Sequence, residues 1–335
     1  MNKSRSSKRK IKRIIKFAAA ALLAVVLVCG IFVGITVWET NRGEYKAPNS
    51  FEVPDSALEY DGKKYDLKEN VETILVMGLD KYEQAEDDTY SNNMQADFLM
   101  LLIIDNDAQK CTALHINRDT ITSMNVLGVA GDKVDVVSKQ IALAHTYGNG
   151  KEISCRNTAE AVSNLLLGIE IDYYLSVTME AVEVYNDFVG GVEVTVLDDF
   201  KGIDDTLVKG ETVTLMGEHA LHYVRSRYGL EDSSNNHRME RQKQYLKALY
   251  DKTQWALNND SDFIVNAASK LTPYIVSNCS GNKLQSVMEK IADYELTEIR
   301  DLEGESVKGE SFMEFYPDGK SVEETVISLF YTPRD

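Results

Sequence analysis

The chain has 335 residues, with 36 Lys+Arg against 53 Asp+Glu and a formal net charge of −17. Eight of the 36 basic residues lie in the first 16 positions, so the rest of the chain holds 28 basic residues against all 53 acidic ones. DNA and RNA binding depends on neutralising phosphates with Lys and Arg, so this balance excludes nucleic acid as an expected partner. The 44% hydrophobic content predicts a real core, and one α/β domain of about 260 residues fits the length.

The N-terminus predicts a membrane anchor. Residues 1–16 form a basic tail without an acidic residue, and residues 17–38 are uncharged. A helix of that length spans about 33 Å, enough to cross a hydrocarbon core of about 30 Å. The basic tail keeps the N-terminus in the cytoplasm, so we expect a single-pass protein of the cell membrane with an extracellular domain. A cleaved signal peptide is the alternative, but it has a shorter apolar region and a small-residue cleavage site, which residues 38–42 do not offer.

A polar linker and three strands are expected next. Residues 39–70 are polar, contain Pro48 and Pro54, and predict a juxtamembrane linker, so the folded extracellular domain is expected over 71–335. Short apolar runs separated by turn residues predict strands at 74–77, 98–104 and 111–116. The last two strands are close enough in sequence to form a hairpin.

Helices and strands interleave in the remainder of the chain. The helix over 157–168 is expected to be capped by Asn157 or Thr158. The other predicted elements are a strand at 171–177, a helix at 179–188, a strand at 192–196, helices at 217–223, 236–257 and 260–270, and mixed elements at 283–293 and 322–330. This alternation predicts a three-layer α-β-α sandwich with a central mixed β-sheet.

Three cysteines, Cys111, Cys155 and Cys279, follow the predicted span, where disulfides form. Cys111 lies in an apolar strand and is interpreted as a buried thiol, so a Cys155–Cys279 disulfide is expected. His219 and His222 share a short helical segment, but no third metal ligand is near them in the sequence.

Polar residues gather at the ends of the first three strands. In a hairpin, the start of the second strand lies beside the end of the third. Asp97 therefore falls near Arg118 and Asp119. Asp80, which follows the first strand, joins the same edge if that strand runs antiparallel to the second. The alternative interpretation is that these are ordinary polar residues at strand ends.

Arginines recur at spacings that place them together. Arg225 and Arg227 share one side of an extended backbone. Arg238, Arg241 and Gln242 share one face of a helix. Guanidinium groups bind phosphate oxygens bidentately, and hard divalent ions bind through one or two carboxylates plus substrate phosphates. The two sets together indicate a diphosphate site with a bound metal; surface salt bridges are the alternative.

Seven stretches appear in the order seen in the LytR-CpsA-Psr family, which the chain resembles over about residues 71–250. They are residues 74–80, 95–97, 116–120, 144–148, 190–192, 220–227 and 238–242. The resemblance implies a ligase that moves a phosphorylated glycan from a polyprenyl diphosphate carrier onto peptidoglycan. Wall teichoic acid and capsule are the typical cargoes.

Matching the motifs also implies a role for each site residue. Asp80 and Asp97 would hold magnesium, with manganese as an alternative. Asp119 would orient Arg118 or assist the acceptor. The residues implied to bind the diphosphate are Arg118, Arg225, Arg227, Arg238 and Gln242, with Gln95 at a further contact position. Arg118, Asp119, Arg225 and Arg227 are the predicted catalytic residues.

The chain departs from the family pattern at three positions. Gln95 stands where the family often has arginine, and Gln140 stands where it often has lysine. His145 replaces a common aromatic residue and is interpreted as a packed histidine rather than a general base. On helices over the sheet, Val162, Leu165 and Leu166 are candidates to house the lipid tail, although plain core is their default interpretation.

Two other functions remain open at this point. With water as acceptor, the same site would make the protein a polyprenyl diphosphate hydrolase. Alternatively, the domain is a non-catalytic module that binds a lipid-linked glycan, a hypothesis to which Gln95 gives some weight. A transcriptional regulator is disfavoured by the acidic, extracellular domain.

Overall fold

The computed structural model describes residues 58–79, 94–226, 230, 235–260, 262–280, 283, 286, 290, 294–310 and 312–334. The predicted basic tail and membrane span, residues 1–38, lie outside this part of the chain. Within it, every helix is too short or too polar to cross a bilayer.

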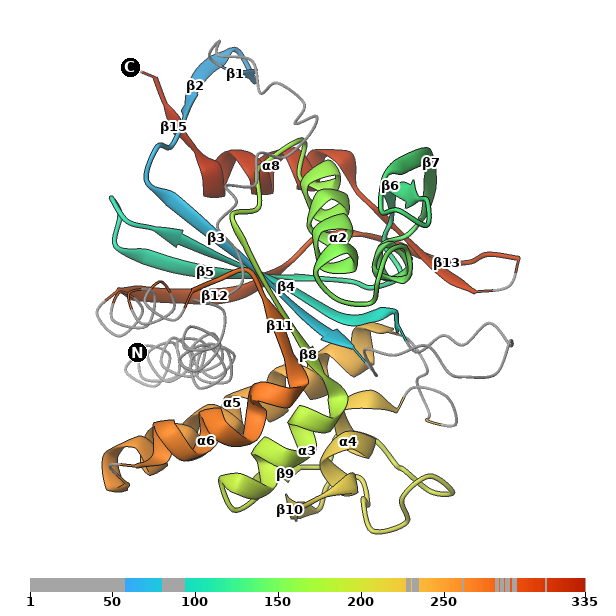
Figure 1. Ribbon diagram of the computed structural model, residues 1–335, viewed down its shortest axis with the longest axis vertical. Coiled ribbons are helices and arrows are strands. Elements are labelled where there is room, and N and C mark those ends of the chain that lie inside the picture. Colours follow the sequence, from blue (N-terminus) through green and yellow to red (C-terminus); the bar gives the residue numbers. More distant parts are fainter. Residues whose placement is uncertain are drawn as a thin grey trace, which may run out of the picture.

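A six-stranded mixed sheet forms the centre of the fold (Figure 1). Its strands, in spatial order, are β11 (Ile275–Ser277), β8 (Tyr173–Thr178), β3 (Val71–Leu79), β4 (Ala96–Asp105), β5 (Lys110–Ile116) and β12 (Glu295–Asp301). β3 pairs antiparallel with β4 and parallel with β8, and β4 and β5 form the predicted hairpin. The predicted mixed sheet is therefore confirmed.

The central strands are continuous apolar runs because both faces of the sheet are covered. Side chains alternate between the two faces along a strand. Ile74 and Val76 of β3 therefore join one buried cluster, and Leu75 and Met77 join the other. All four side chains are at most 6% exposed.

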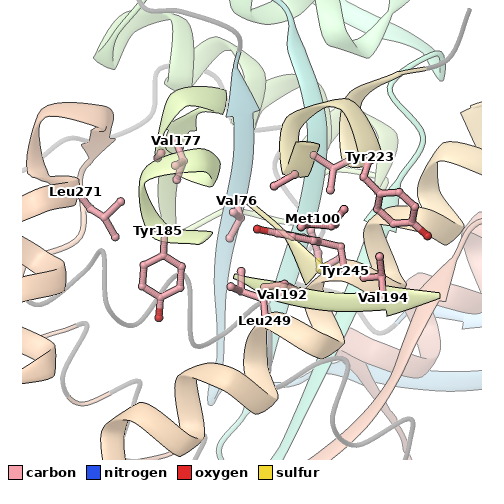
Figure 2. Packing of buried hydrophobic residues seen from close by; sticks show 14 of the residues in the cluster. Val76, Met100, Val177, Tyr185, Val192, Val194, Tyr223, Tyr245, Leu249 and Leu271 are labelled. Carbon is pink, nitrogen blue, oxygen red and sulfur yellow. The ribbon is translucent and has the colours of Figure 1, made fainter. Parts of the chain in front are cut away.

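Different helices cover the two faces (Figure 1). One face carries α3 (Met179–Phe188), α4 (Glu218–Arg225), α5 (Asn235–Asn259), α6 (Phe263–Leu271) and the hairpin of β9 (Val192–Thr195) and β10 (Thr212–Leu215). The other face carries α2 (Glu152–Leu165) and α8 (Gly319–Phe330). On the first face, Val76 and Met100 of the sheet pack with Tyr245 and Leu249 of α5 (Figure 2).

The start of α2 differs from the prediction. The helix begins at Glu152, five residues before the predicted cap at Asn157. Asn149 Oδ1 accepts hydrogen bonds from the backbone N–H groups of Lys151 and Ile153, which stabilises the first turn. Asn157 is instead buried, and its amide donates to Ala144 O at 2.8 Å. Asn157, a residue type that often caps helices, therefore makes a tertiary hydrogen bond instead of a cap.

Part of the predicted linker belongs to the domain. Residues 58–67 form β1 (Leu58–Tyr60) and β2 (Lys63–Leu67), and β2 pairs with β15 (Tyr331–Pro333). Lys68 fastens this sheet to the domain, since its Nζ donates to Asp105 at 2.8 Å and to Leu329 O at 2.9 Å. The polar composition of this stretch is typical of exposed strands, which is why it resembled a linker.

The sequence did not predict several further elements. The hairpin of β6 (Ile121–Leu127) and β7 (Lys133–Gln140) leads into η3 (Ile141–Thr146). The other elements missed include β10, β15, η4 (Thr272–Tyr274) and the hairpin of β13 (Gly304–Lys308) and β14 (Met313–Pro317). Residues after 258, for which no motif was found, supply α6, both edge strands of the central sheet and α8.

The predicted Cys155–Cys279 disulfide is wrong. Cys111, Cys155 and Cys279 are all free and buried. Cys155 lies on α2 with its Sγ 3.6 Å from Nε2 of His145, whereas Cys279 follows the edge strand β11. Burial raises the pKa of the Cys111 and Cys155 thiols to about 12, so both stay protonated at neutral pH. The prediction of Cys111 as a buried thiol is confirmed.

Candidate active site

The hairpin of β4 and β5 brings the predicted polar residues to one edge of the sheet. In the antiparallel register of this hairpin, Leu99 lies opposite Ile116. Asp97, two residues before Leu99, therefore comes opposite Arg118, two residues after Ile116. The β3–β4 register also shifts here, because Gly78 pairs with Phe98 and the next residue of β3 pairs with Ala96. Asp97 is therefore the extra residue of a bulge, a device that redirects a side chain at a sheet edge.

Arg118 is the centre of the resulting cluster. Its Nη1 donates to Asp97 Oδ1 and its Nη2 donates to Gln95 Oε1. Its Nε lies 3.6 Å from Asp119 Oδ1. The side chains of Arg118, Asp97 and Asp119 are 13%, 12% and 4% exposed, so these charges lie in a poorly solvated environment. The guanidinium is consequently held in one orientation by three oxygen groups.

Gln95 contacts the arginine side of the cluster. The side chain is buried, and its amide oxygen accepts the hydrogen bond from Arg118. An arginine here would place a second positive group against Arg118, whereas glutamine supplies an acceptor. The departure from the family pattern therefore exchanges a cation for a neutral group that orients the neighbouring arginine.

Asp119 is fixed from a second direction. Gln140 Nε2 donates to Asp119 Oδ1 at 3.1 Å and to Met313 O at 2.6 Å. The backbone of Phe315 donates to Asp119 O at 2.9 Å. The end of β7 and the strand β14 thus hold the carboxylate beside Arg118.

Arg238 reaches the same edge from α5. Its Nη2 donates to the backbone oxygen of Asp97 at 3.3 Å, and its Nη1 lies 3.9 Å from Asp97 Oδ1. The side chain is only 6% exposed. The structure therefore brings together Gln95, Asp97, Arg118, Asp119 and Arg238, which are separated by up to 143 positions in the sequence.

The other polar residues on this face of α5 support α4. Arg241 forms a buried ion pair with Asp198, and both side chains are 1% exposed. Its Nε also donates to Tyr223 O at 2.9 Å, and Gln242 Nε2 donates to Val224 O at 3.1 Å. These bonds satisfy carbonyls at the C-terminal end of α4, which carries the exposed Arg225.

Two predicted site residues, Asp80 and Arg227, lie outside the described residues. The shared face of Arg238, Arg241 and Gln242 is confirmed as a geometric feature. Their contacts nevertheless differ, because Arg238 reaches the strand edge whereas Arg241 is enclosed and paired with Asp198.

An apolar cavity of about 90 Å³ adjoins the charged edge. It lies on the face of the sheet covered by α3, α4 and α5, and its only strongly polar side chain is that of Gln242. The lining residues are Val76, Met77, Gly78, Phe98, Val177, Thr178, Met179, Val182, Val224, Gln242, Tyr245 and Leu246. Phe98 follows Asp97 directly, and Gln242 lies one helical turn after Arg238, so the cavity and the charged cluster share two elements.

The residues proposed from sequence to house a lipid tail lie elsewhere. Val162, Leu165 and Leu166 are at most 6% exposed and pack with Leu75 and Leu101 under α2. That is the opposite face of the sheet from the apolar cavity. Their default interpretation as core is confirmed, and their assignment to the tail stays a prediction.

A second, polar cavity lies beside the start of α5, lined by residues that include His115, Asn117, Lys243, Asp301 and Glu303. His115 is 2% exposed, and its ring packs at a tilt of 42° against Phe98 with 5.0 Å between ring centroids. Burial, with the nearby positive charges of Lys243 and Arg238, lowers the pKa of His115 to about 3. The sequence offered no signal for this residue, because it belongs to an ordinary apolar strand.

His145 is a packed histidine, as interpreted from the sequence. It is fully buried, and its Nδ1 lies 2.8 Å from the carbonyl oxygen of Met94. Burial lowers the pKa of His145 to about 4. Both buried histidines are therefore neutral at physiological pH and poor proton acceptors.

Several known proteins are similar to this chain in sequence or in fold. A polyisoprenyl-teichoic acid–peptidoglycan teichoic acid transferase TagU from Enterococcus faecalis is 28% identical over 194 residues, covering 57% of this chain and 56% of that protein. The cell wall biosynthesis protein LcpA from Corynebacterium glutamicum is 28% identical over 205 residues, covering 52% of this chain and 38% of that protein. The match thus spans about half or less of the length of these relatives.

A solved structure of TagT bound to LI-WTA matches the fold with a TM-score of 0.56 and 20% identity, covering 84% of this chain and 98% of that chain. The model of the LytR_cpsA_psr family matches residues 39–327, which is most of the sequence. The chain therefore belongs to the LytR-CpsA-Psr family.

Proposed function

We propose that the chain is a membrane-anchored, extracellular phosphotransferase that moves a phosphorylated glycopolymer from a polyprenyl diphosphate carrier to peptidoglycan. The name of the TagU relative supports this reaction class. The TagT structure bound to LI-WTA supports a wall glycopolymer as ligand of this fold. The anchor would be residues 17–38, with the domain on the outer side of the membrane.

The observation that carries the proposal is the contact between an apolar cavity and a buried charged cluster. A polyprenyl diphosphate has an apolar tail and an anionic head. The cavity behind Phe98 fits the start of the tail, and Arg118 and Arg238 at Asp97 fit the head. Two guanidinium groups in a poorly solvated site attract a diphosphate strongly, because low solvation strengthens charge interactions.

The carboxylate set is compatible with a divalent ion. Asp97 offers hard oxygen donors at a partly open sheet edge, and such ions bind through one or two carboxylates plus substrate phosphates. Asp97 and Asp80 would hold magnesium, or alternatively manganese, and the ion would offset charge on the diphosphate. Because Asp97 accepts from Arg118, it also fixes the distance between carboxylate and guanidinium groups.

The transfer forms a bond from the acceptor hydroxyl oxygen to the glycan-side phosphorus and breaks the bond from that phosphorus to the bridging oxygen. Prenyl phosphate leaves with that oxygen, and the hydroxyl proton passes to the leaving phosphate or to solvent. Arg118, Arg225, Arg227 and Arg238 stabilise the negative charge that develops. The buried His115 and His145 are poor bases, so positioning and electrostatics provide most of the catalysis.

The acceptor approaches, in this proposal, from the polar cavity. Its lining includes Asn117, which precedes Arg118, and Met239, which follows Arg238. Its mixture of amide, amine and carboxylate groups suits sugar hydroxyls, which both donate and accept hydrogen bonds.

The test uses the full-length chain in detergent with a labelled polyprenyl diphosphate-linked glycan and magnesium. Products are compared with and without peptidoglycan. Label on peptidoglycan supports transfer, whereas label released equally without it identifies a hydrolase. Donor binding without turnover would identify a non-catalytic binding module, and absence of donor binding would contradict the assignment of the cavity.

A further inference from the structure

A second group of side chains converges away from the Asp97 cluster. His219 and His222 lie one turn apart on α4 and so share a face of the helix. Asp204 comes from the loop between β9 and β10. Its Oδ2 lies 2.6 Å from Nδ1 of His219 and 3.0 Å from Nδ1 of His222. One potential ligand atom from each of these three residues lies within 4.8 Å of the other two.

The carboxylate is oriented in the way that a metal ligand requires. Asp204 Oδ1 accepts hydrogen bonds from the hydroxyl of Thr206 at 2.6 Å and from its backbone N–H at 3.2 Å. These bonds occupy one oxygen and leave Oδ2 facing the two imidazoles. Hydrogen-bonded outer partners of this kind fix first ligands in metal sites.

The loop that carries Asp204 is itself well anchored. Phe200 and Leu207 are at most 2% exposed, and the ring of Phe200 stacks on Tyr223 of α4 with 5.7 Å between centroids. The Asp204 side chain is 4% exposed, while His219 and His222 are 47% and 38% exposed. The donor atoms thus lie close together, and one side of the cluster is open to solvent.

We propose that Asp204, His219 and His222 bind a divalent ion of the zinc class through one carboxylate oxygen and two imidazole nitrogens. Two imidazoles favour zinc over magnesium, which prefers oxygen ligands. Three protein ligands leave a fourth tetrahedral position, which the open side supplies to water. The sequence could not indicate the third ligand, because Asp204 precedes the histidines by 15 and 18 positions.

A bound ion would fasten the loop to α4. The last residue of this helix is Arg225, one of the predicted diphosphate contacts, and Arg241 and Gln242 donate to carbonyls at its C-terminal end. The ion would therefore fix α4 between two supports and limit the movement of Arg225. This role is separate from the ion expected at Asp97.

The alternative is a metal-free arrangement in which both imidazoles donate to one carboxylate oxygen. To distinguish the two, the full-length chain is stripped with a chelator and titrated with Zn²⁺ alone, measuring bound zinc by equilibrium dialysis and its effect on the Tm. Replacement by Co²⁺ adds a visible absorption band that reports imidazole coordination. We expect one ion per chain and a higher Tm with zinc.

The variants separate ligation from folding. His222→Ala and Asp204→Asn should abolish the bound zinc, and Thr206→Val, which keeps all three ligands, should weaken zinc binding ~10–100-fold. His237→Ala is the matched control, because His237 is also an exposed imidazole 3.0 Å from a buried aspartate, Asp198, and should bind zinc like the parent. Absence of zinc binding by the parent, or equal binding by the folded His222→Ala variant, would overturn the proposal.

Discussion

The two faces of the central sheet are built from similar apolar side chains, yet they differ next to the charged edge. Under α2 and α8, residues such as Leu101 and Val162 belong to a packed cluster and are fully buried. Under α3, α4 and α5, the ends of β3 and β8 leave an apolar cavity beside Gln242. On this second face, α5 is positioned by hydrogen bonds to α4 and to Asp97 as well as by packing.

The largest effect is expected from breaking the buried ion pair that positions α5. Arg241→Ala leaves Asp198 charged and enclosed, which should lower the free energy of unfolding by about 3–5 kcal/mol. Denaturant titration measures this change in the free energy of unfolding. Arg334→Ala, which removes an exposed pair with Asp66, should change the unfolding midpoint far less. Equal midpoints for the two variants would mean that Arg241 does not support this face.

Removing the central guanidinium of the charged edge tests its role in transfer. Arg118→Ala should lower the rate of glycopolymer transfer ~10²–10³-fold, by analogy with the loss of a group that stabilises developing negative charge. Single-turnover transfer to peptidoglycan is the measurement. Gln95→Ala, which keeps the guanidinium and removes only one oriented acceptor, should have a smaller effect. An unchanged rate in Arg118→Ala would show that the site is misassigned.

The buried histidines, one on each face, should make stability fall in weak acid. The pKa of His145 is lowered to about 4 and that of His115 to about 3, so the folded protein binds fewer protons than the unfolded chain below pH 6.5. Keeping these two histidines unprotonated therefore costs the folded protein little above that pH, and the cost in free energy of unfolding grows as the pH falls. Between pH 6.5 and 5, each should lower the free energy of unfolding by about 2 kcal/mol.

Denaturant titrations across that pH range test the prediction. The variant His115→Gln should show a flatter dependence of the unfolding free energy on pH than the parent. An identical slope would mean that His115 becomes protonated in the folded state.

The smallest change in the free energy of unfolding is expected for a substitution at the apolar cavity. Val182→Phe adds volume at the cavity and should change the free energy of unfolding by less than about 1 kcal/mol, while Val162→Phe overpacks the closed face and should cost about 1–3 kcal/mol. Thermal unfolding measures both. Val182→Phe should also weaken binding of the polyprenyl diphosphate donor, and tight donor binding by this variant would place the lipid tail elsewhere.

Local pattern predicted much of this molecule. The apolar runs at 74–77, 98–104 and 111–116 became β3, β4 and β5, and the hairpin spacing alone put Asp97 beside Arg118. The hairpin of β6 and β7 was missed; β7 is exposed along most of its length, whereas β6 is largely buried or half-buried. Asn157 was misread as a cap because its residue type does not reveal whether the partner is local or remote.

The sequence by itself determined the central strands β3, β4 and β5, the acidic balance, and the set of polar residues at strand ends, because these follow from short-range periodicity and residue chemistry. Only the tertiary structure decided which of two equally apolar faces contains a cavity, that Arg238 reaches Asp97 while Arg241 is buried against Asp198, and that Asp204 meets two histidines. Those outcomes depend on contacts between distant segments. Such contacts form only after the sheet and its helices have packed together.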